Sequence, residues 1–202
     1  MNKINILHIF AGFGVGGGER YLLLLVDNYN KERYEISFVC SNFEAFLAEA
    51  MRRQREVLTV DMDMKCNPIT FWRIITFIRK KKISIVHTHN PGASFYGRIA
   101  AKLAGVPVIV STIHNSLFDF PISRLRRSTY VFIDRFTSRL CDKIICVSDA
   151  LAWDLVHRCG INANKVITIH NGIDLENFGL NQDTDYLLKE FSISQEEKKS
   201  GL

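Results

Sequence analysis

The chain has 202 residues, of which 47% are hydrophobic and 23% charged, and a formal net charge of +5. These proportions are typical of a folded globular protein and exclude a disordered chain. No run of about 20 apolar residues predicts a membrane-spanning helix. The mild basic excess is compatible with an anionic partner, but no interleaving of basic and aromatic residues predicts nucleic acid binding.

Short apolar runs rich in β-branched residues alternate with longer, helix-like runs along the whole chain. The predicted strands are residues 4–10, 34–41, 56–60, 83–88, 106–112, 143–148 and 166–170. The predicted helices are residues 19–28, 43–53, 70–82, 93–104, 122–140 and 150–158. This alternation predicts an α/β fold with a parallel sheet of about seven strands and helices on both faces.

Capping residues support the predicted helix boundaries. Asn67 precedes a proline at the start of a helix, Ser148 precedes another helix, and Gly105 follows the end of a third. The chain divides into a main domain over residues 1–180 and a polar segment over residues 181–202, which we expect to be a linker and the start of a further, absent domain.

The five cysteines are widely spaced and none forms a Cys-x-x-Cys pair, which argues against structural zinc. The sequence opens without a signal peptide. We therefore expect a reducing, cytoplasmic location in which the thiols stay free and are mostly buried.

Five glycines lie within residues 12–18, between the first strand and the first helix. Glycines let the backbone approach a ligand closely, and a helix N-terminus attracts anions, so the segment predicts a phosphate or diphosphate site. A flexible turn without a ligand is the alternative. Gly12, Gly14 and Gly17 also match the spacing of a dinucleotide site. That interpretation, an NAD-type domain, is disfavoured because the end of the second strand carries Ser41 and Asn42 and no carboxylate.

Histidines follow two of the predicted strands. His87 and His89 are two residues apart on a strand, so their side chains share one face. They could ligate a metal, but the sequence offers no evident third ligand, and we expect them to pack and hydrogen-bond without one. His114 follows the fifth strand, where its imidazole could contact a polar ligand or be satisfied by the backbone.

A basic stretch begins the long predicted helix near residue 124. It contains Arg124, Arg126 and Arg127. Basic amphipathic helices can lie on anionic membranes, which is the interaction that this stretch predicts. The alternative is a solvated helix without a partner.

Four segments, in this order, resemble the N-terminal half of the retaining glycosyltransferases of family 4, whose GT-B fold has two facing Rossmann-like domains. They are GGGERYLL at residues 16–23, IVHTH at 85–89, GVPVIVSTIH at 105–114, and DKIICVS at 142–148 followed by VITIHNGID at 166–174. The resemblance covers about residues 4–180.

The resemblance implies a donor side for the site. His114 would be the catalytic residue, hydrogen-bonded to the donor sugar near the reacting centre. The other implied donor-binding residues are Gly16, Gly17, Gly18, Asn171 and Gly172.

It also implies an acceptor side, formed by His87, His89 and Asn90. The implied reaction moves a sugar from a nucleotide-sugar to a hydroxyl with retained anomeric configuration and without metal or cofactor. The acceptor would be a saccharide or a lipid-linked molecule of polysaccharide or glycolipid synthesis, which would place the protein in the cytoplasm or at the inner face of the membrane.

In this family most nucleotide-binding residues lie in the second domain. We therefore expect this chain alone to be inactive. The alternative function is a non-catalytic module, derived from such an enzyme, that binds lipid or a protein partner.

Overall fold

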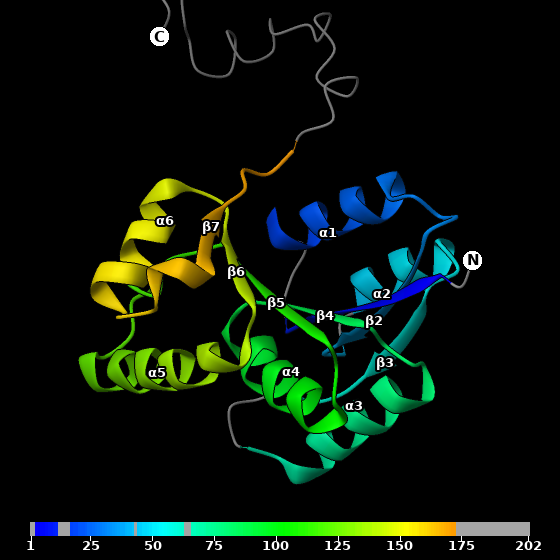
Figure 1. Cartoon of the computed structure of the whole chain (residues 1–202), viewed down its shortest axis with the longest axis horizontal. Helices are drawn as coiled ribbons and strands as arrows, with labels where there is room; N and C mark the ends of the chain where they lie inside the picture. The colour runs from blue at the N-terminus through cyan, green and yellow to red at the C-terminus, as the bar shows by residue number, and fades with distance from the viewer. Residues whose placement is uncertain (1–2, 12–16, 43, 63–65, 173–202) are drawn as a thin grey trace, which may run out of the picture. The chain divides into compact units, whose positions relative to one another are not determined.

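The computed structural model describes residues 3–11, 17–42, 44–62 and 66–172, and the residues up to Asn171 form one compact unit (Figure 1). Their seven strands are β1 (Ile4–Phe10), β2 (Tyr34–Cys40), β3 (Glu56–Thr59), β4 (Ile85–His89), β5 (Val108–Ile113), β6 (Lys143–Cys146) and β7 (Val166–Thr168). All neighbouring pairs are parallel, in the order β3-β2-β1-β4-β5-β6-β7. The order reverses between β1 and β4, and ligands bind at such switch points in open α/β sheets.

Six helices accompany the sheet in the described part of the chain. They are α1 (Gly17–Asn28), α2 (Glu44–Arg52), α3 (Pro68–Lys80), α4 (Pro91–Ala104), α5 (Arg124–Thr137) and α6 (Asp149–Trp153). A 3₁₀ turn (Ser138–Leu140) extends α5, and a π-helical turn (Asp154–Arg158) extends α6. The α/β fold and every predicted strand and helix are confirmed. The predicted domain boundary at residue 180 lies outside the described residues.

The predicted caps are confirmed by their geometry. The Asn67 side chain accepts a hydrogen bond from the Ile69 backbone N–H at 3.0 Å, and the Ser148 hydroxyl accepts one from the Leu151 N–H at 3.3 Å. Gly105 ends α4 with φ 79°, a left-handed conformation that glycine adopts without strain.

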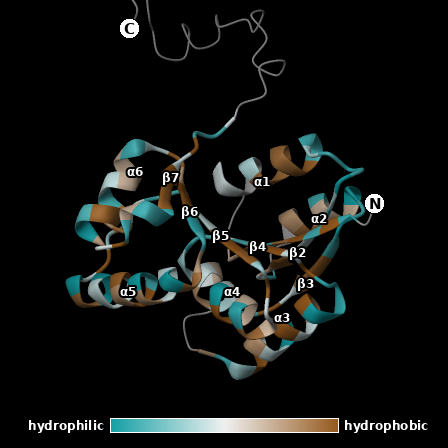
Figure 2. Cartoon of the chain, in the orientation of Figure 1, coloured by the Kyte–Doolittle hydropathy of each residue, from teal (hydrophilic) through white to brown (hydrophobic). Residues whose placement is uncertain are grey.

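Two hydrophobic layers cover the two faces of the sheet. Alternate residues of β1 point to opposite faces. Ile9 packs in a cluster with Ile74 of α3 and with residues of α4, whereas Phe10 packs with Leu22 of α1 and with residues of α2. Figure 2 shows the strands as mostly hydrophobic and the helices as mixtures of hydrophobic and hydrophilic residues.

Helix α4 lies very close to the sheet because Gly97 has no side chain. A Cβ atom at Gly97 would lie 2.5 Å from Thr88 Cγ2 and 3.0 Å from Ile9 Cδ1. Any larger residue must therefore push α4 away from β1 and β4.

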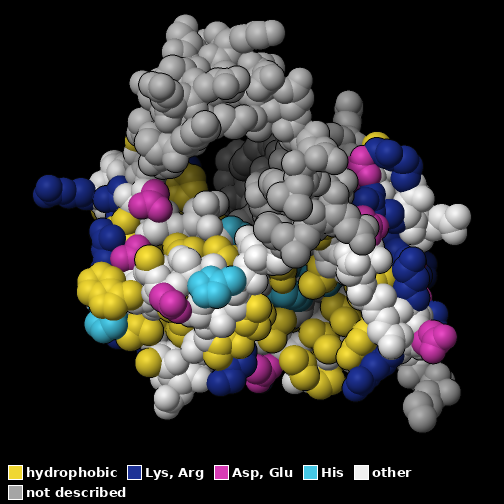
Figure 3. Space-filling model, turned by 90° about the horizontal axis from the view of Figure 1, so that it is seen from above, with side chains coloured by type: hydrophobic (Ala, Val, Ile, Leu, Met, Phe, Trp, Pro, Cys, Tyr) yellow, Lys and Arg dark blue, Asp and Glu magenta, His cyan; other side chains and the backbone are white. Residues whose placement is uncertain are grey.

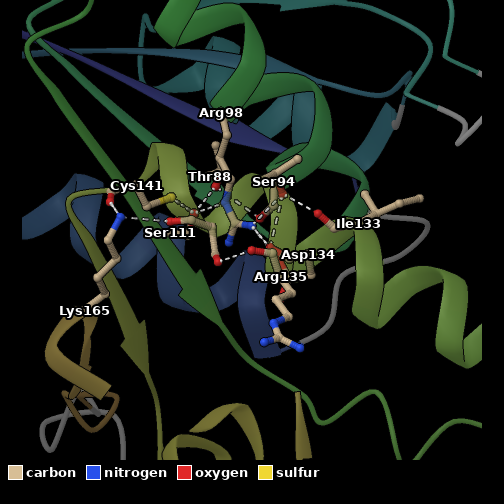
Figure 4. A network of polar contacts seen from close by, with 11 residues as sticks. Thr88, Ser94, Arg98, Ser111, Ile133, Asp134, Arg135, Cys141 and Lys165 are labelled. Atoms are coloured by element: carbon tan, nitrogen blue, oxygen red, sulfur yellow. Dashed lines mark hydrogen bonds and ion pairs between the residues drawn. The ribbon is translucent and has the colours of Figure 1, made fainter. Parts of the chain in front are cut away.

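A buried ion pair ties α4 to α5 (Figure 4). Arg98 is fully buried, and its Nη1 lies 2.5 Å from Oδ1 of Asp134. The same guanidinium donates to the hydroxyls of Ser111 on β5, at 2.9 Å, and of Thr137, at 3.0 Å. Buried charges of this kind are tolerated when they are paired and hydrogen-bonded.

The five cysteines are free, and all except Cys66 are buried. This confirms the predicted state of the thiols. Burial raises the pKa of Cys40 to about 12 and contributes most to raising the pKa of Cys146 and Cys159 to about 11. No helix in the described part of the chain has the length and apolar character needed to cross a bilayer.

Candidate functional site

The switch point brings together three residues that the sequence singled out. His89 ends β4, His114 directly follows β5, and Gly18 lies in the first turn of α1. The His89 Nδ1 and His114 Nε2 atoms are 3.3 Å apart. A Cβ atom built on Gly18 would lie 3.5 Å from Cδ2 of His114, so the α1 backbone contacts the imidazole directly.

His114 belongs to a row of four histidines, which we name the histidine row: His8, His87, His89 and His114. Successive ring centroids are 5.0, 4.2 and 5.6 Å apart. The parallel register explains the row, because His8 is paired with His87 across β1 and β4. His8, His87 and His89 are buried beneath the surface, and Figure 3 shows hydrophobic and histidine side chains exposed together on one face of the molecule.

Tyr21 of α1 covers one end of the histidine row. Its ring lies 5.5 Å from that of His114, in an edge-on arrangement, and 6.2 Å from that of His89. Burial raises the pKa of the Tyr21 hydroxyl above its ordinary value.

Three members of the row are buried and neutral. Burial lowers the pKa of His8 to about 4. Burial, together with the neighbouring histidines, holds the pKa of His87 and of His89 well below the ordinary value. Each ring therefore has one N–H donor and one acceptor nitrogen at neutral pH.

The sequence offered no evident third ligand beside His87 and His89, and the structure places His8 there. His8 completes the only group of three potential metal ligands among the residues that the structure describes. Its Nδ1 lies 3.1 Å from Nε2 of His89, and Nε2 of His87 lies 2.7 Å from the Thr112 hydroxyl. The three rings thus have hydrogen-bond partners, and the group includes no carboxylate to offset a cation's charge.

Asn90 joins the two segments that frame the site. Its amide donates to the Ala11 carbonyl at 2.8 Å, and its oxygen accepts from the Ala11 N–H at 3.2 Å. It also caps α4, with a left-handed φ of 69°. Asn90 therefore fixes the end of β1 against the start of α4, and its acceptor role stays a prediction.

An apolar pocket of about 90 Å³ opens beside His114. Leu117 and Phe118, from the segment after β5, line it together with Leu151 and Leu155 near α6. Asn115 adds a polar group. Mostly apolar hollows with a few polar groups are typical ligand sites, and sequence analysis did not predict this one.

The family model described as Glycosyltransferase Family 4 matches residues 15–177. The chain belongs to Glycosyltransferase Family 4. Its sequence is 27% identical over 188 residues to the UDP-Gal:alpha-D-GlcNAc-diphosphoundecaprenol alpha-1,3-galactosyltransferase of Escherichia coli, a match that covers 88% of this chain and 47% of the relative. The Family 4 chain thus spans about half the length of that relative.

Solved structures show the same fold. Anabaena Alr3699/HepE in complex with UDP superposes with a TM-score of 0.74 at 17% identity, covering 94% of this chain and 50% of HepE. The lipopolysaccharide outer core galactosyltransferase WaaB, in its apo form, gives a TM-score of 0.62 at 17% identity over 85% of this chain and 46% of WaaB. At these low sequence identities the structural likeness shows only that the Family 4 domain has a GT-B-type fold.

The remaining predicted donor residues lie in different places. Gly16 is outside the described residues. Gly17 begins α1 and is exposed, and Asn171 and Gly172 are exposed beyond β7. Their roles in the Family 4 site stay predictions.

The predicted membrane arginines lie at the start of α5 and differ in their contacts. Arg124 and Arg126 are exposed. Arg127 is half-buried and donates to the carbonyls of Leu117, at 3.3 Å, and Phe120, at 3.0 Å. Arg127 therefore stabilises the segment that lines the pocket.

Proposed function

We propose that this Family 4 domain is the acceptor-side half of an enzyme that transfers a sugar from a nucleotide-sugar to a hydroxyl, with retention of the anomeric configuration. The observation that carries the proposal is the meeting of Gly18, His89 and His114 at the switch point, beside an apolar pocket. The start of α1 supplies a positive dipole end there, which stabilises the negative charge that develops on a departing diphosphate.

In this proposal His114 hydrogen-bonds the donor sugar. Tyr21 and the other residues of the histidine row hold the His114 ring in place. Positioning of the reacting groups can contribute much of the rate enhancement of an enzyme. In this proposal the reaction uses no resident metal or cofactor, and the protein supplies hydrogen bonds and a helix dipole where charge develops.

The named relatives support a particular class of substrates. The E. coli relative is named for a UDP-galactose donor and a diphosphoundecaprenol acceptor, and HepE has been solved with UDP-glucose. We propose a UDP-hexose donor and a lipid-linked saccharide acceptor. The apolar pocket would receive a weakly polar part of the acceptor.

A chimera tests the transfer. The 202-residue chain is joined to the part of the E. coli galactosyltransferase that it does not match, and label transfer from UDP-galactose to a lipid-linked acceptor is measured. We expect turnover by the chimera and none by the chain alone, with the product's anomeric configuration, read by NMR, retained. An inverted product would contradict the retaining mechanism.

Two variants of the chimera identify the residue responsible. His114→Ala should lower kcat at least about 100-fold, as expected when a group that positions the reacting atoms is lost. His157→Ala, an exposed histidine near α6, is the matched control and should leave kcat unchanged. Equal activity of the two variants would refute the role of His114, and no turnover by any chimera would favour a non-catalytic module.

We also propose that α5 contacts an anionic membrane. Leu125, Phe132 and Phe136 are 79%, 71% and 60% exposed and, at spacings of seven and four residues, share one helix face. The exposed Arg124 and Arg126 accompany them. Apolar side chains flanked by arginines are typical of helices that lie in a membrane interface.

Vesicle binding tests this contact. The chain should sediment with phosphatidylglycerol vesicles and not with phosphatidylcholine vesicles, and Phe132→Ser with Phe136→Ser should abolish the binding. Arg124→Gln with Arg126→Gln should weaken it more than the matched pair Arg33→Gln with Lys102→Gln, which removes the same charge from exposed sites elsewhere. Equal effects of the two pairs would contradict a specific surface.

A further inference from the structure

Two hydrogen bonds link three histidines into a chain that ends at the candidate site. Nδ1 of His8 faces Nε2 of His89 at 3.1 Å, and Nδ1 of His89 faces Nε2 of His114 at 3.3 Å. The planes of the bonded rings are tilted by only 26° and 24°, and the ring centroids are 5.4 and 5.6 Å apart. These centroid distances are too long for face-to-face stacking and match two nitrogens that point at each other within the ring planes.

The hydrogen-bonded chain of three histidines restricts which ring nitrogens carry protons. A neutral imidazole donates from one nitrogen and accepts at the other, and His89 uses both nitrogens. If His8 donates to His89, then His89 donates to His114, and all three rings carry the proton on Nδ1. If His114 donates instead, all three carry it on Nε2. Mixed tautomers would leave a bond with two protons or with none.

We propose that His89 is a positioning residue that fixes the ring orientation and the tautomer of His114, and that His8 fixes the tautomer of His89 in turn. The consequence of this positioning for catalysis rests on the proposed function of His114. The tautomer coupling itself does not, because it is a property of the folded chain without substrate.

His87 provides a matched control within the same row. Its ring is the nearest to His89, at 4.2 Å, yet its hydrogen bond runs to Thr112. A variant at His87 removes a buried imidazole of the same size and leaves the His8–His89 and His89–His114 hydrogen bonds intact.

Nuclear magnetic resonance of the ¹⁵N-histidine-labelled 202-residue chain tests the coupling. Two-bond ¹H–¹⁵N correlations report which nitrogen of each ring carries the proton. We expect His8, His89 and His114 to show one and the same tautomer. Different tautomers among the three rings, or a rapidly exchanging mixture at His89, would overturn the proposal even if no variant folds.

Substitution of His8, at the far end of the histidine chain, then tests whether this residue determines the tautomer of His114. His8→Leu should convert His114 from one tautomer to a mixture, although His8 is not bonded to His114, whereas His87→Leu should leave the His114 tautomer unchanged. Identical His114 spectra in both variants would overturn the coupling. So would stoichiometric binding of added Zn²⁺ to His8, His87 and His89, because a metal would replace the His8–His89 hydrogen bond.

The chimera described above gives the catalytic readout. His89→Leu should lower kcat about 10- to 100-fold while the KM for the donor changes less than about twofold, because His114 remains present but loses its fixed orientation. His89→Asn, whose amide lies where Nδ1 lies, should recover part of kcat. Equal loss in both variants, or a change in KM alone, would contradict positioning. A chimera without turnover would refute the proposed function and leave the tautomer result standing.

Discussion

Replacing Arg98 by methionine should severely destabilise the fold. The substitution leaves the buried Asp134 carboxylate without its partner and removes the donors to Ser111 and Thr137. Leaving one charge of a buried pair uncompensated costs about 3–5 kcal/mol. Since domains of this kind have total stabilities of about 5–15 kcal/mol, this is a large share of the free energy of unfolding.

Urea denaturation followed by circular dichroism measures the loss. The urea concentration at the midpoint of unfolding should fall for Arg98→Met, while the dependence of the free energy of unfolding on urea concentration stays constant. Lys102→Met is the matched control, because Lys102 is an exposed cation one turn further along α4; it should change stability by less than about 0.5 kcal/mol.

A double variant separates the lost pair from the lost packing. Arg98→Met with Asp134→Leu leaves no buried charge, so it should be more stable than Arg98→Met alone. A loss below about 1 kcal/mol for Arg98→Met, or a double variant that is destabilised by the sum of both single changes, would refute the reasoning.

Three further changes follow from the packing and the charges. Gly97→Ala should lower stability by about 1–3 kcal/mol in the same urea assay, because the new methyl group would overlap Thr88; an unchanged midpoint would show that α4 can shift freely. Asn90→Ala should cost about 1–2 kcal/mol through the lost cap of α4 and the lost bonds to Ala11, whereas Asn115→Ala, at an exposed position, should cost almost nothing. Stability should be level between about pH 7 and 8, and it should fall as the pH drops from 6.5, the ordinary histidine pKa, toward 4, because the unfolded chain then binds protons that buried His8 does not. His8 alone accounts for about 3 kcal/mol of this loss, and an acid titration of His8→Leu with the wild-type slope would contradict that assignment.

The sequence predicted the elements well for a physical reason. Strands of a parallel sheet are covered on both faces, so β1 and β5 are mostly apolar, whereas β4 is apolar only where it begins, at Ile85 and Val86. Each run ends at a glycine, histidine or asparagine, and the carboxyl ends of parallel strands lie at one edge. This is why Gly18, His89 and His114, which are far apart in sequence, could be expected at one site.

The features that the sequence did not predict, namely the place of His8 and the buried Arg98–Asp134 pair, depend on strand register and on helix packing. His8 is one of two polar residues in the otherwise apolar strand β1, and only the pairing of β1 with β4 places it beside His87. Arg98 and Asp134 lie on two separate helices, and either could be a solvated residue on a polar helix face. Nothing local in the sequence indicates that α4 and α5 bury those two faces against each other.

The distribution of the thiols makes this protein convenient for site-specific probes. Cys66 is exposed, while the four other cysteines are buried, three of them with pKa values raised by burial. Only thiolates react readily with maleimides. A fluorophore or spin label should therefore attach at Cys66 in the native chain without removal of the other cysteines. It would lie just before α3, on a segment next to Tyr96, whose hydroxyl accepts a hydrogen bond from the Asn67 N–H.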